Sequence, residues 1–184
     1  MNAPAQPTLE AVLSSLIHDV ADFPEPGIVF KDISPMLADH EAFTTVVNAL
    51  AESGRDDAGA VVVDKVVGIE ARGFILAAPV ALTLGTGFVP VRKVGKLPGL
   101  TYKQSYALEY GEATLEVQRE AFAEGDRVLV IDDVLATGGT IAATASLVER
   151  ASAIVTGIAV LIELAFLSGR DNLAGHSLHA LMTV

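Results

Sequence analysis

The chain contains no cysteine, and aromatic residues make up only 5% of its 184 positions. The absence of cysteine excludes disulfide frameworks, thiolate nucleophiles and cysteine-ligated zinc sites. Basic residues are also scarce, because 12 Lys and Arg stand against 23 Asp and Glu, for a formal net charge of −11. Such an acidic chain is poorly suited to coating nucleic acid or an anionic membrane. The 51% of hydrophobic residues is instead typical of one folded core.

Recognisable targeting and membrane signals are missing as well. The first seven residues lack the basic start and apolar run of a signal peptide. The longest apolar stretches, residues 74–84 and 158–167, are too short to span a bilayer. We therefore expect a cytoplasmic protein, and its length favours one domain over residues 1–184.

The few basic residues are unevenly distributed. Residues 65–103 contain six bases and one acid, Glu70, which gives this window a net charge of +5 and leaves −16 for the rest. A basic window in an acidic chain indicates either a solvated surface or a site for a small anion.

Hydrophobic periodicity and turn residues predict alternating helices and strands. Helices are expected at residues 9–20, 41–53, 74–84 and 140–150, and a projecting hairpin at 102–117. Strands are expected at residues 61–69, 88–94, 127–131, 154–164 and 176–184, with a short extended piece at 28–30. This alternation predicts an α/β fold around a parallel sheet.

Residues 128–140 carry the most specific motif. A hydrophobic strand delivers Asp132 and Asp133, and a loop containing Gly138 and Gly139 then leads into a helix. Ligands of open α/β sheets bind at the carboxyl ends of strands, and backbone N–H groups at a helix N-terminus attract phosphate. Because neighbouring strand residues point to opposite faces, the two carboxylates point the same way only if the strand ends before them.

This run resembles the signature of the type I phosphoribosyltransferase family, whereas the Walker and Rossmann glycine patterns are missing. Residues 23–35, 68–74, 92–99 and 105–111 are similar, in the same order, to segments of the adenine-specific members of that family. The resemblance covers residues from about 23 to 163.

The resemblance implies a type I phosphoribosyltransferase fold, in which helices flank a central, mostly parallel sheet. It also implies a small N-terminal hood at about residues 1–35 and a β-hairpin lid at about 95–118. The implied reaction joins adenine to phosphoribosyl pyrophosphate and releases AMP and pyrophosphate. It uses Mg²⁺ held mainly through substrate and water, and the implied enzyme is a homodimer with no nucleic-acid or membrane partner.

The same resemblance assigns the site residues. The ribose-5-phosphate would be bound by Asp132, Asp133, Ala136, Thr137, Gly138, Gly139 and Thr140. The pyrophosphate would be bound by Arg72, Arg92, Lys93 and Lys96, and adenine by Val29, Phe30 and Lys31. Tyr106 and Tyr110 belong to the lid, where Glu109 is the expected catalytic acid–base group for a proton on the adenine ring.

Two alternatives remain open at this point. An enzyme for hypoxanthine, guanine or xanthine would call for a late basic residue, and only Arg170 follows Glu163. A non-catalytic regulator that senses phosphoribosyl pyrophosphate would call for a DNA-binding extension, which the sequence lacks.

Overall fold

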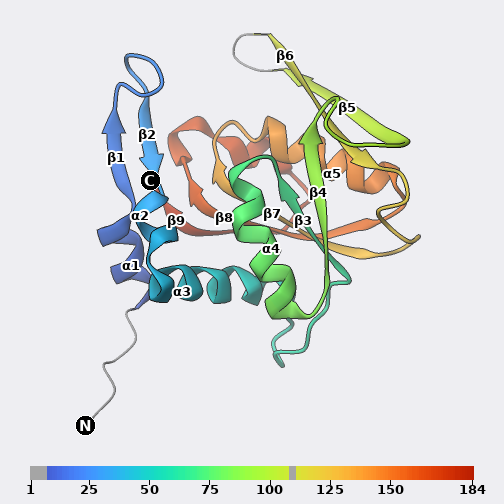
Figure 1. Cartoon of the computed structure of the whole chain (residues 1–184), viewed down its shortest axis with the longest axis horizontal. Coiled ribbons are helices and arrows are strands. Elements are labelled where there is room, and N and C mark those ends of the chain that lie inside the picture. The colour runs from blue at the N-terminus through green and yellow to red at the C-terminus, as the bar shows by residue number, and fades with distance from the viewer. Residues whose placement is uncertain (1–7, 108–110) are drawn as a thin grey trace. The chain divides into compact units, whose positions relative to one another are not determined.

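The computed structural model describes residues 8–107 and 111–184 (Figure 1). Glu109 and Tyr110, predicted in the lid, lie outside the described residues. The chain separates into two compact units, Met1–Ala49 and Leu50–Val184, and each is described here by itself.

The first unit begins with α1, Leu9–Leu16, capped by the Thr8 hydroxyl, which accepts a hydrogen bond from the Ala11 N–H. The predicted continuation of this helix to residue 20 is wrong. The backbone is already extended at Ile17, and β1 (His18–Ala21) pairs antiparallel with β2 (Val29–Asp32). Between them the chain turns back at Gly27, whose N–H donates to Asp22 Oδ1 at 2.8 Å.

Two further helices follow β2. The short α2, Ser34–Ala38, was not predicted, whereas α3, His40–Ala51, lies where a helix was expected. A 3₁₀ turn, η1 (Glu52–Gly54), ends this segment at the predicted glycine.

The second unit contains a seven-stranded sheet in the order β5-β6-β4-β3-β7-β8-β9. Its strands are β3 (Lys65–Ile69), β4 (Gly87–Lys93), β5 (Thr101–Ala107), β6 (Glu112–Gln118), β7 (Arg127–Leu135), β8 (Ile154–Glu163) and β9 (Leu178–Thr183). Five of them run parallel, and the β5–β6 hairpin joins β4 through an antiparallel pair. The predicted α/β class and hairpin are therefore confirmed.

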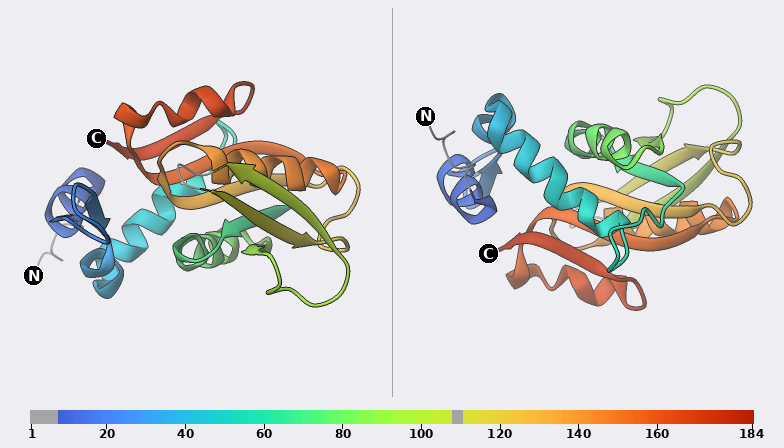
Figure 2. Two further views of the ribbon diagram at one scale, coloured as in Figure 1. Left: turned by 90° about the horizontal axis from the view of Figure 1, so that it is seen from above. Right: turned by 90° about the horizontal axis from the view of Figure 1, so that it is seen from below.

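Helices cover both faces of this sheet (Figure 2). On one face lies α4, Arg72–Leu84, which ends as predicted at a left-handed Gly85. On the other lies α5, Gly139–Arg150. The central strands β3, β7 and β8 are almost entirely buried and hydrophobic, as expected for parallel strands with both faces covered. No helix within the described residues is both long and apolar enough to cross a membrane.

Two glycines bring α4 into direct contact with the sheet. A Cβ at Gly68 on β3 would lie 2.7 Å from the Ala77 Cβ, and one at Gly73 on α4 would lie 2.8 Å from Asp132 Oδ1. The missing side chains therefore allow the first turn of α4 to pack against β7 beside its aspartates.

Candidate active site

The carboxyl ends of three neighbouring strands meet at one edge of the sheet. The parallel register pairs Gly68 on β3 with Ile131 on β7, and Ile69 with Val91 on β4. The residues that follow each strand therefore emerge side by side. These are the segments for which the sequence predicts anion binding.

The acidic pair lies within β7 rather than after it. The sequence predicts that the strand ends at residue 131, but β7 continues to Leu135, because Asp132 pairs with Val160 and Leu135 with Glu163 on β8. Strand alternation alone would place the two carboxylates on opposite faces of the sheet, yet both approach the first turn of α4. Asp132 Oδ1 lies 2.8 Å from the Cβ position of Gly73, and Asp133 Oδ2 lies 2.6 Å from Arg72 Nη2. Both are buried.

Arg72, the first residue of α4, neutralises one member of this pair. Its Nη2 lies 2.6 Å from Asp133 Oδ2, and the Asp133 N–H donates to Asp132 Oδ1 at 2.9 Å. Burial, reinforced by the neighbouring Asp133 charge, raises the pKa of Asp132 well above its usual range. The site thus contains a carboxyl whose ionised form is unfavourable until a polar ligand or a cation arrives.

The glycine loop surrounds a small hollow at the start of α5. This hollow has a volume of about 70 Å³ and is lined by Asp132, Val134, Leu135, Ala136, Thr137, Gly138, Thr140 and Ile141. The N-cap residue is Gly138 (φ +84°), which has no side chain that could accept from the first N–H groups of the helix. A larger hollow of about 270 Å³, near the amino ends of β8 and β9, is lined by none of the predicted residues. The geometry therefore favours the predicted loop as an anion site.

A second segment supports this loop from behind. Asn172, in the 3₁₀ helix η3 (Gly169–Leu173), donates from Nδ2 to the Thr137 carbonyl at 2.7 Å. A Cβ at Gly138 would overlap the Gly169 carbonyl oxygen, so the two backbones touch directly. Sequence reasoning missed both η3 residues, because they follow the loop by about 30 positions and belong to no motif.

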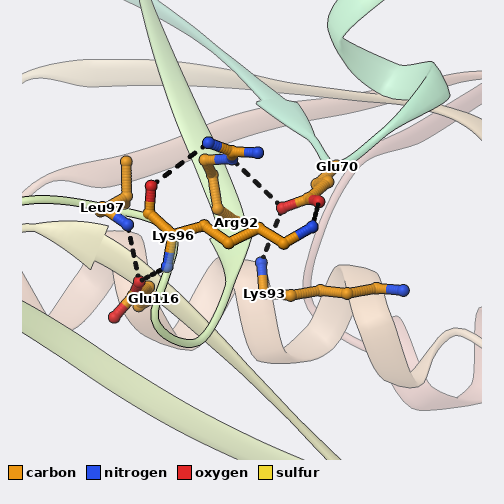
Figure 3. A network of polar contacts seen from close by, with 6 residues as sticks. All are labelled: Glu70, Arg92, Lys93, Lys96, Leu97 and Glu116. Atoms are coloured by element: carbon orange, nitrogen blue, oxygen red, sulfur yellow. Dashed lines mark hydrogen bonds and ion pairs between the residues drawn. The ribbon is translucent and has the colours of Figure 1, made fainter.

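The basic residues at the end of β4 and in the loop that follows it gather around a carboxylate that the sequence analysis did not assign (Figure 3). Glu70 Oε2 accepts from Arg92 Nε at 3.2 Å and from the Lys93 N–H at 3.0 Å, while Lys96 Nζ lies 2.5 Å from Oε1. The Lys93 side chain extends away from this cluster, so only its backbone takes part. Three of the four predicted cations, Arg72 included, therefore lie at or just after the β3 and β4 carboxyl ends with a carboxylate partner.

The described part of the predicted lid contacts the predicted phosphate loop. Thr140 Oγ1 donates to the Tyr106 hydroxyl at 3.0 Å, and a Cβ at Gly139 would lie 3.2 Å from the Tyr106 ring. The hairpin stem also lies along α5, because Arg150 Nη1 donates to the Lys103 carbonyl at 2.6 Å. Tyr106 is thus placed at the predicted 5-phosphate site.

The three residues predicted to bind adenine lie on β2 in the first unit. The Phe30 ring meets the Phe23 ring edge to face, with centroids 5.1 Å apart, and Lys31 Nζ lies 2.6 Å from Asp19 Oδ1. An open hollow of about 280 Å³ is lined by Val20, Phe23, Phe30 and Asp32. The unit therefore presents an aromatic surface next to the backbone predicted to read the base.

Comparison with known proteins identifies the family. A family model described as the phosphoribosyl transferase domain matches residues 35–174. An adenine phosphoribosyltransferase of Nocardioides sp. is 62% identical over 181 residues, which cover 98% of this chain and 97% of the relative. The chain belongs to the adenine phosphoribosyltransferase family.

Solved structures of the family agree with this placement. The adenine phosphoribosyltransferase of Thermoanaerobacter pseudethanolicus is 47% identical, with a TM-score of 0.89 over 96% of this chain and 100% of the other. That of Saccharomyces cerevisiae, solved with adenine and an imino-altritol bisphosphate, is 38% identical, with a TM-score of 0.87 over 92% and 96% of the two chains. The fold predicted from the sequence motifs is therefore confirmed.

Proposed function

We propose that the chain transfers the phosphoribosyl group of phosphoribosyl pyrophosphate to N9 of adenine, forming AMP and pyrophosphate in purine salvage. The observation that carries this proposal is the arrangement at the sheet edge. There, a glycine loop after β7 lies at the same edge of the sheet as a cluster of cations at the carboxyl ends of β3 and β4. A substrate with phosphates on both sides of a ribose requires two such anion sites. The yeast relative solved with adenine supports the choice of base.

The loop from Ala136 to Thr140 would hold the 5-phosphate through its backbone N–H groups, its threonine hydroxyls and the dipole of α5. Asp132 and Asp133 would accept hydrogen bonds from the ribose hydroxyls. The raised pKa of Asp132 has burial as its first cause, and hydroxyl donors compensate a buried carboxylate for the water it has lost.

The reaction concentrates negative charge on the departing pyrophosphate. Arg72, Arg92 and Lys96 would stabilise that charge through charge-assisted hydrogen bonds. Lys93, at the end of β4, would contribute through its backbone N–H, which orders Glu70. Donors fixed in place before the charge develops are commonly the largest contribution to catalysis.

Adenine would stack on Phe30, and backbone groups of Val29 and Lys31 would read its edge. The Lys31 ammonium is paired with Asp19, which favours the backbone rather than this side chain as the reader of the base. Glu109 would exchange a proton with the adenine ring, a contribution of roughly 10²–10⁴-fold for a well-placed acid–base group.

The side chains present fit a magnesium ion held mostly by its substrate. Among residues 8–107 and 111–184, no three His, Cys, Asp or Glu side chains form a metal-binding group. Mg²⁺ accepts one or two carboxylates and completes its shell with phosphates and water. Asp132 and Asp133 lie in the strand that leads into the phosphate loop, and they would contact the shell of the ion through water or the ribose hydroxyls. When bound, the ion supplies Lewis-acid stabilisation of the leaving group.

A homodimer and a cytoplasmic location complete the proposal. Ile75 and Leu82, seven residues apart on α4, are 43% and 82% exposed. Residues at this spacing share one helix face, and an exposed apolar face supports association with a second copy of the chain.

Arg170, the late basic residue that an oxopurine substrate would call for, is bound by other groups of the protein. Both Arg170 Nε and Nη2 bind the Glu163 carboxylate, at 2.6 and 2.7 Å, and Nη1 donates to the Leu178 carbonyl. Arg170 thus ties η3 to the sheet.

The test is an assay of the purified chain with Mg²⁺, phosphoribosyl pyrophosphate and each purine in turn. Product from adenine alone is expected. Product from hypoxanthine, guanine or xanthine at a comparable rate would contradict the proposed base, and no product from any base would favour the regulator.

A further inference from the structure

We propose that Glu70 is the positioning residue of the pyrophosphate subsite, whose buried carboxylate fixes Arg92 and Lys96 before the polyanion binds. The inference rests on the proposed function, because it assumes that these two cations meet the pyrophosphate group. The proposal therefore includes one acidic residue in a subsite whose other side chains are basic.

Glu70 lies between the end of β3 and the start of α4, and its side chain is only 8% exposed. Its three donors come from β4 and the loop that follows, at least 22 residues further along the chain. A buried carboxylate requires such partners, because an ion removed from water must regain its hydrogen bonds within the protein. Its position is therefore set by the fold, and it can in turn set the position of its donors.

Arg92 is restrained from three directions. Nε donates to Glu70, Nη1 donates to the Lys96 carbonyl at 3.2 Å, and the guanidinium carbon lies 5.9 Å from the centre of the Phe74 ring. About a third of the side chain is nevertheless exposed. The exposed part can meet an anion while the buried contacts hold the plane of the group.

Lys96 is held by two carboxylates with separate tasks. Glu116 on β6 accepts from the backbone N–H groups of Lys96 and Leu97, at 2.9 and 3.0 Å, and so fixes the loop. Glu70 instead binds the ammonium group itself, and the Lys96 side chain as a whole remains about half exposed. The two contacts are visible on opposite sides of Lys96 in Figure 3. Of these two carboxylates, Glu70 is therefore the one that contacts the charged groups of both Arg92 and Lys96.

The charges explain why a carboxylate suits this position. Arg92 and Lys96 both carry positive charge and would repel each other if nothing stood between them. Burial alone would raise the pKa of Glu70, but donors from Lys96, the Lys93 backbone and Arg92 outweigh it and hold the pKa below its usual value. Glu70 consequently stays ionised at neutral pH. Donors ordered in advance lose less conformational freedom when the ligand binds.

Glu70→Gln keeps the size of the side chain but presents a neutral oxygen and an NH₂ donor to a group of donors. We expect the KM for phosphoribosyl pyrophosphate and the Kd for inorganic pyrophosphate with Mg²⁺ to rise about tenfold, the loss of roughly one charge-assisted hydrogen bond. The KM for adenine should stay within about twofold, because that substrate makes no contact with the cations. Glu70→Asp retains the charge and should recover part of the loss.

Asp64→Asn is the matched control. Asp64 also forms an ion pair with an arginine, Arg127, at 2.9 Å, but it precedes β3 at the opposite end of the strand. Asp64→Asn removes the same charge from the chain as Glu70→Gln. It should leave the KM for phosphoribosyl pyrophosphate, the Kd for pyrophosphate and the KM for adenine unchanged.

Steady-state kinetics in both substrates, with calorimetric titration of pyrophosphate, separates the outcomes. If the unaltered chain forms no AMP, the proposed function fails and Glu70 is not the cause. If it forms AMP and Glu70→Gln leaves the pyrophosphate constants unchanged, lowers them, or raises the adenine KM equally, the positioning role is overturned. Should Glu70→Gln not fold, Glu70→Asp decides by the same split between the two substrates.

Discussion

The contact between α4 and β7 yields a quantitative prediction for Gly73→Ala. The added Cβ would lie 2.8 Å from Asp132 Oδ1 and 3.1 Å from the Ile131 carbonyl oxygen. Ordinary contacts of such atoms are nearer 3.4 Å, so α4 and β7 must separate by about 0.5 Å in a closely packed interior. Neither oxygen can yield easily, since both belong to a buried central strand.

Two energies oppose each other in this variant. Overpacking costs about 1–3 kcal/mol, whereas replacing glycine by alanine inside a helix gains up to about 1 kcal/mol. The net loss of about 0–2 kcal/mol should lower Tm by no more than about 8 °C in a chain of this size. The functional loss should be larger. Separation of the two elements moves Arg72 and Asp133, which lie 2.6 Å apart, out of position for the substrate. Loss of one charged hydrogen bond to the substrate, about 1.5–3 kcal/mol, corresponds to roughly 10–150-fold in affinity.

The assay compares Tm with the KM for each substrate. Gly157→Ala serves as the control, because its Cβ would meet Leu129 Cδ1 at 3.4 Å and the Ser53 carbonyl at 3.5 Å, which are normal contacts far from the site. Gly73→Ala should raise the KM for phosphoribosyl pyrophosphate and leave that for adenine unchanged. A variant with unaltered kinetics would refute the argument that this glycine sets the distance between Arg72 and the aspartates.

Three other substitutions test single groups of the site. Tyr106→Phe removes the hydroxyl that contacts Thr140 but keeps the ring. In initial-rate measurements the KM for phosphoribosyl pyrophosphate should rise about 2–10-fold. An unchanged kcat would indicate that the hydroxyl contributes to binding. Glu109→Gln should lower kcat by roughly 10²-fold or more with little change in adenine affinity, and an undiminished kcat would remove its acid–base role. Asp132→Asn should raise Tm at pH 7.5 while weakening substrate binding, because burial beside Asp133 raises the pKa of this carboxyl and makes its ionised form costly. Because its pKa is raised in the folded state, Asp132 destabilises the fold increasingly as the pH rises and the carboxyl must ionise. Below about pH 4 the carboxyl is protonated in both the folded and the unfolded state, so the gain in Tm of Asp132→Asn should vanish there. Calorimetry at pH 7.5 and below pH 4 measures this difference.

The part of the fold that sequence could predict is the part encoded locally. The strand, loop and helix from residue 127 to 150 were recognisable because a buried hydrophobic run, turn glycines and an alanine-rich helix follow one another. The hairpin and the helix ending at Gly85 were predictable for similar reasons. By contrast, the apolar spacing of α1 continues to Val20, and only pairing with β2 beyond the turn makes this residue part of a strand.

The site shows the same division. The roles of Arg72 and Asp133 were predicted from motifs in the sequence, whereas the contacts of the supporting residues were not predicted. Aspartate is unfavourable in strands, and only the ladder to β8 extends β7 through the acidic pair. Glu70 belongs to the motif at residues 68–74, but the groups that it and Asn172 bind are at least 22 residues away, so no local pattern indicates these contacts.

The two compact units divide the proposed recognition tasks along the sequence. Every residue assigned to the edge and face of the base precedes residue 50, and every residue assigned to ribose, phosphate or pyrophosphate follows it. Base preference and sugar-phosphate chemistry can consequently diverge under separate selection. Changes confined to the first 49 residues could alter the contacts to the edge and face of the base, while the binding sites for the common donor are inherited intact. The same boundary gives protein engineers a place to join chimaeras of two phosphoribosyltransferases.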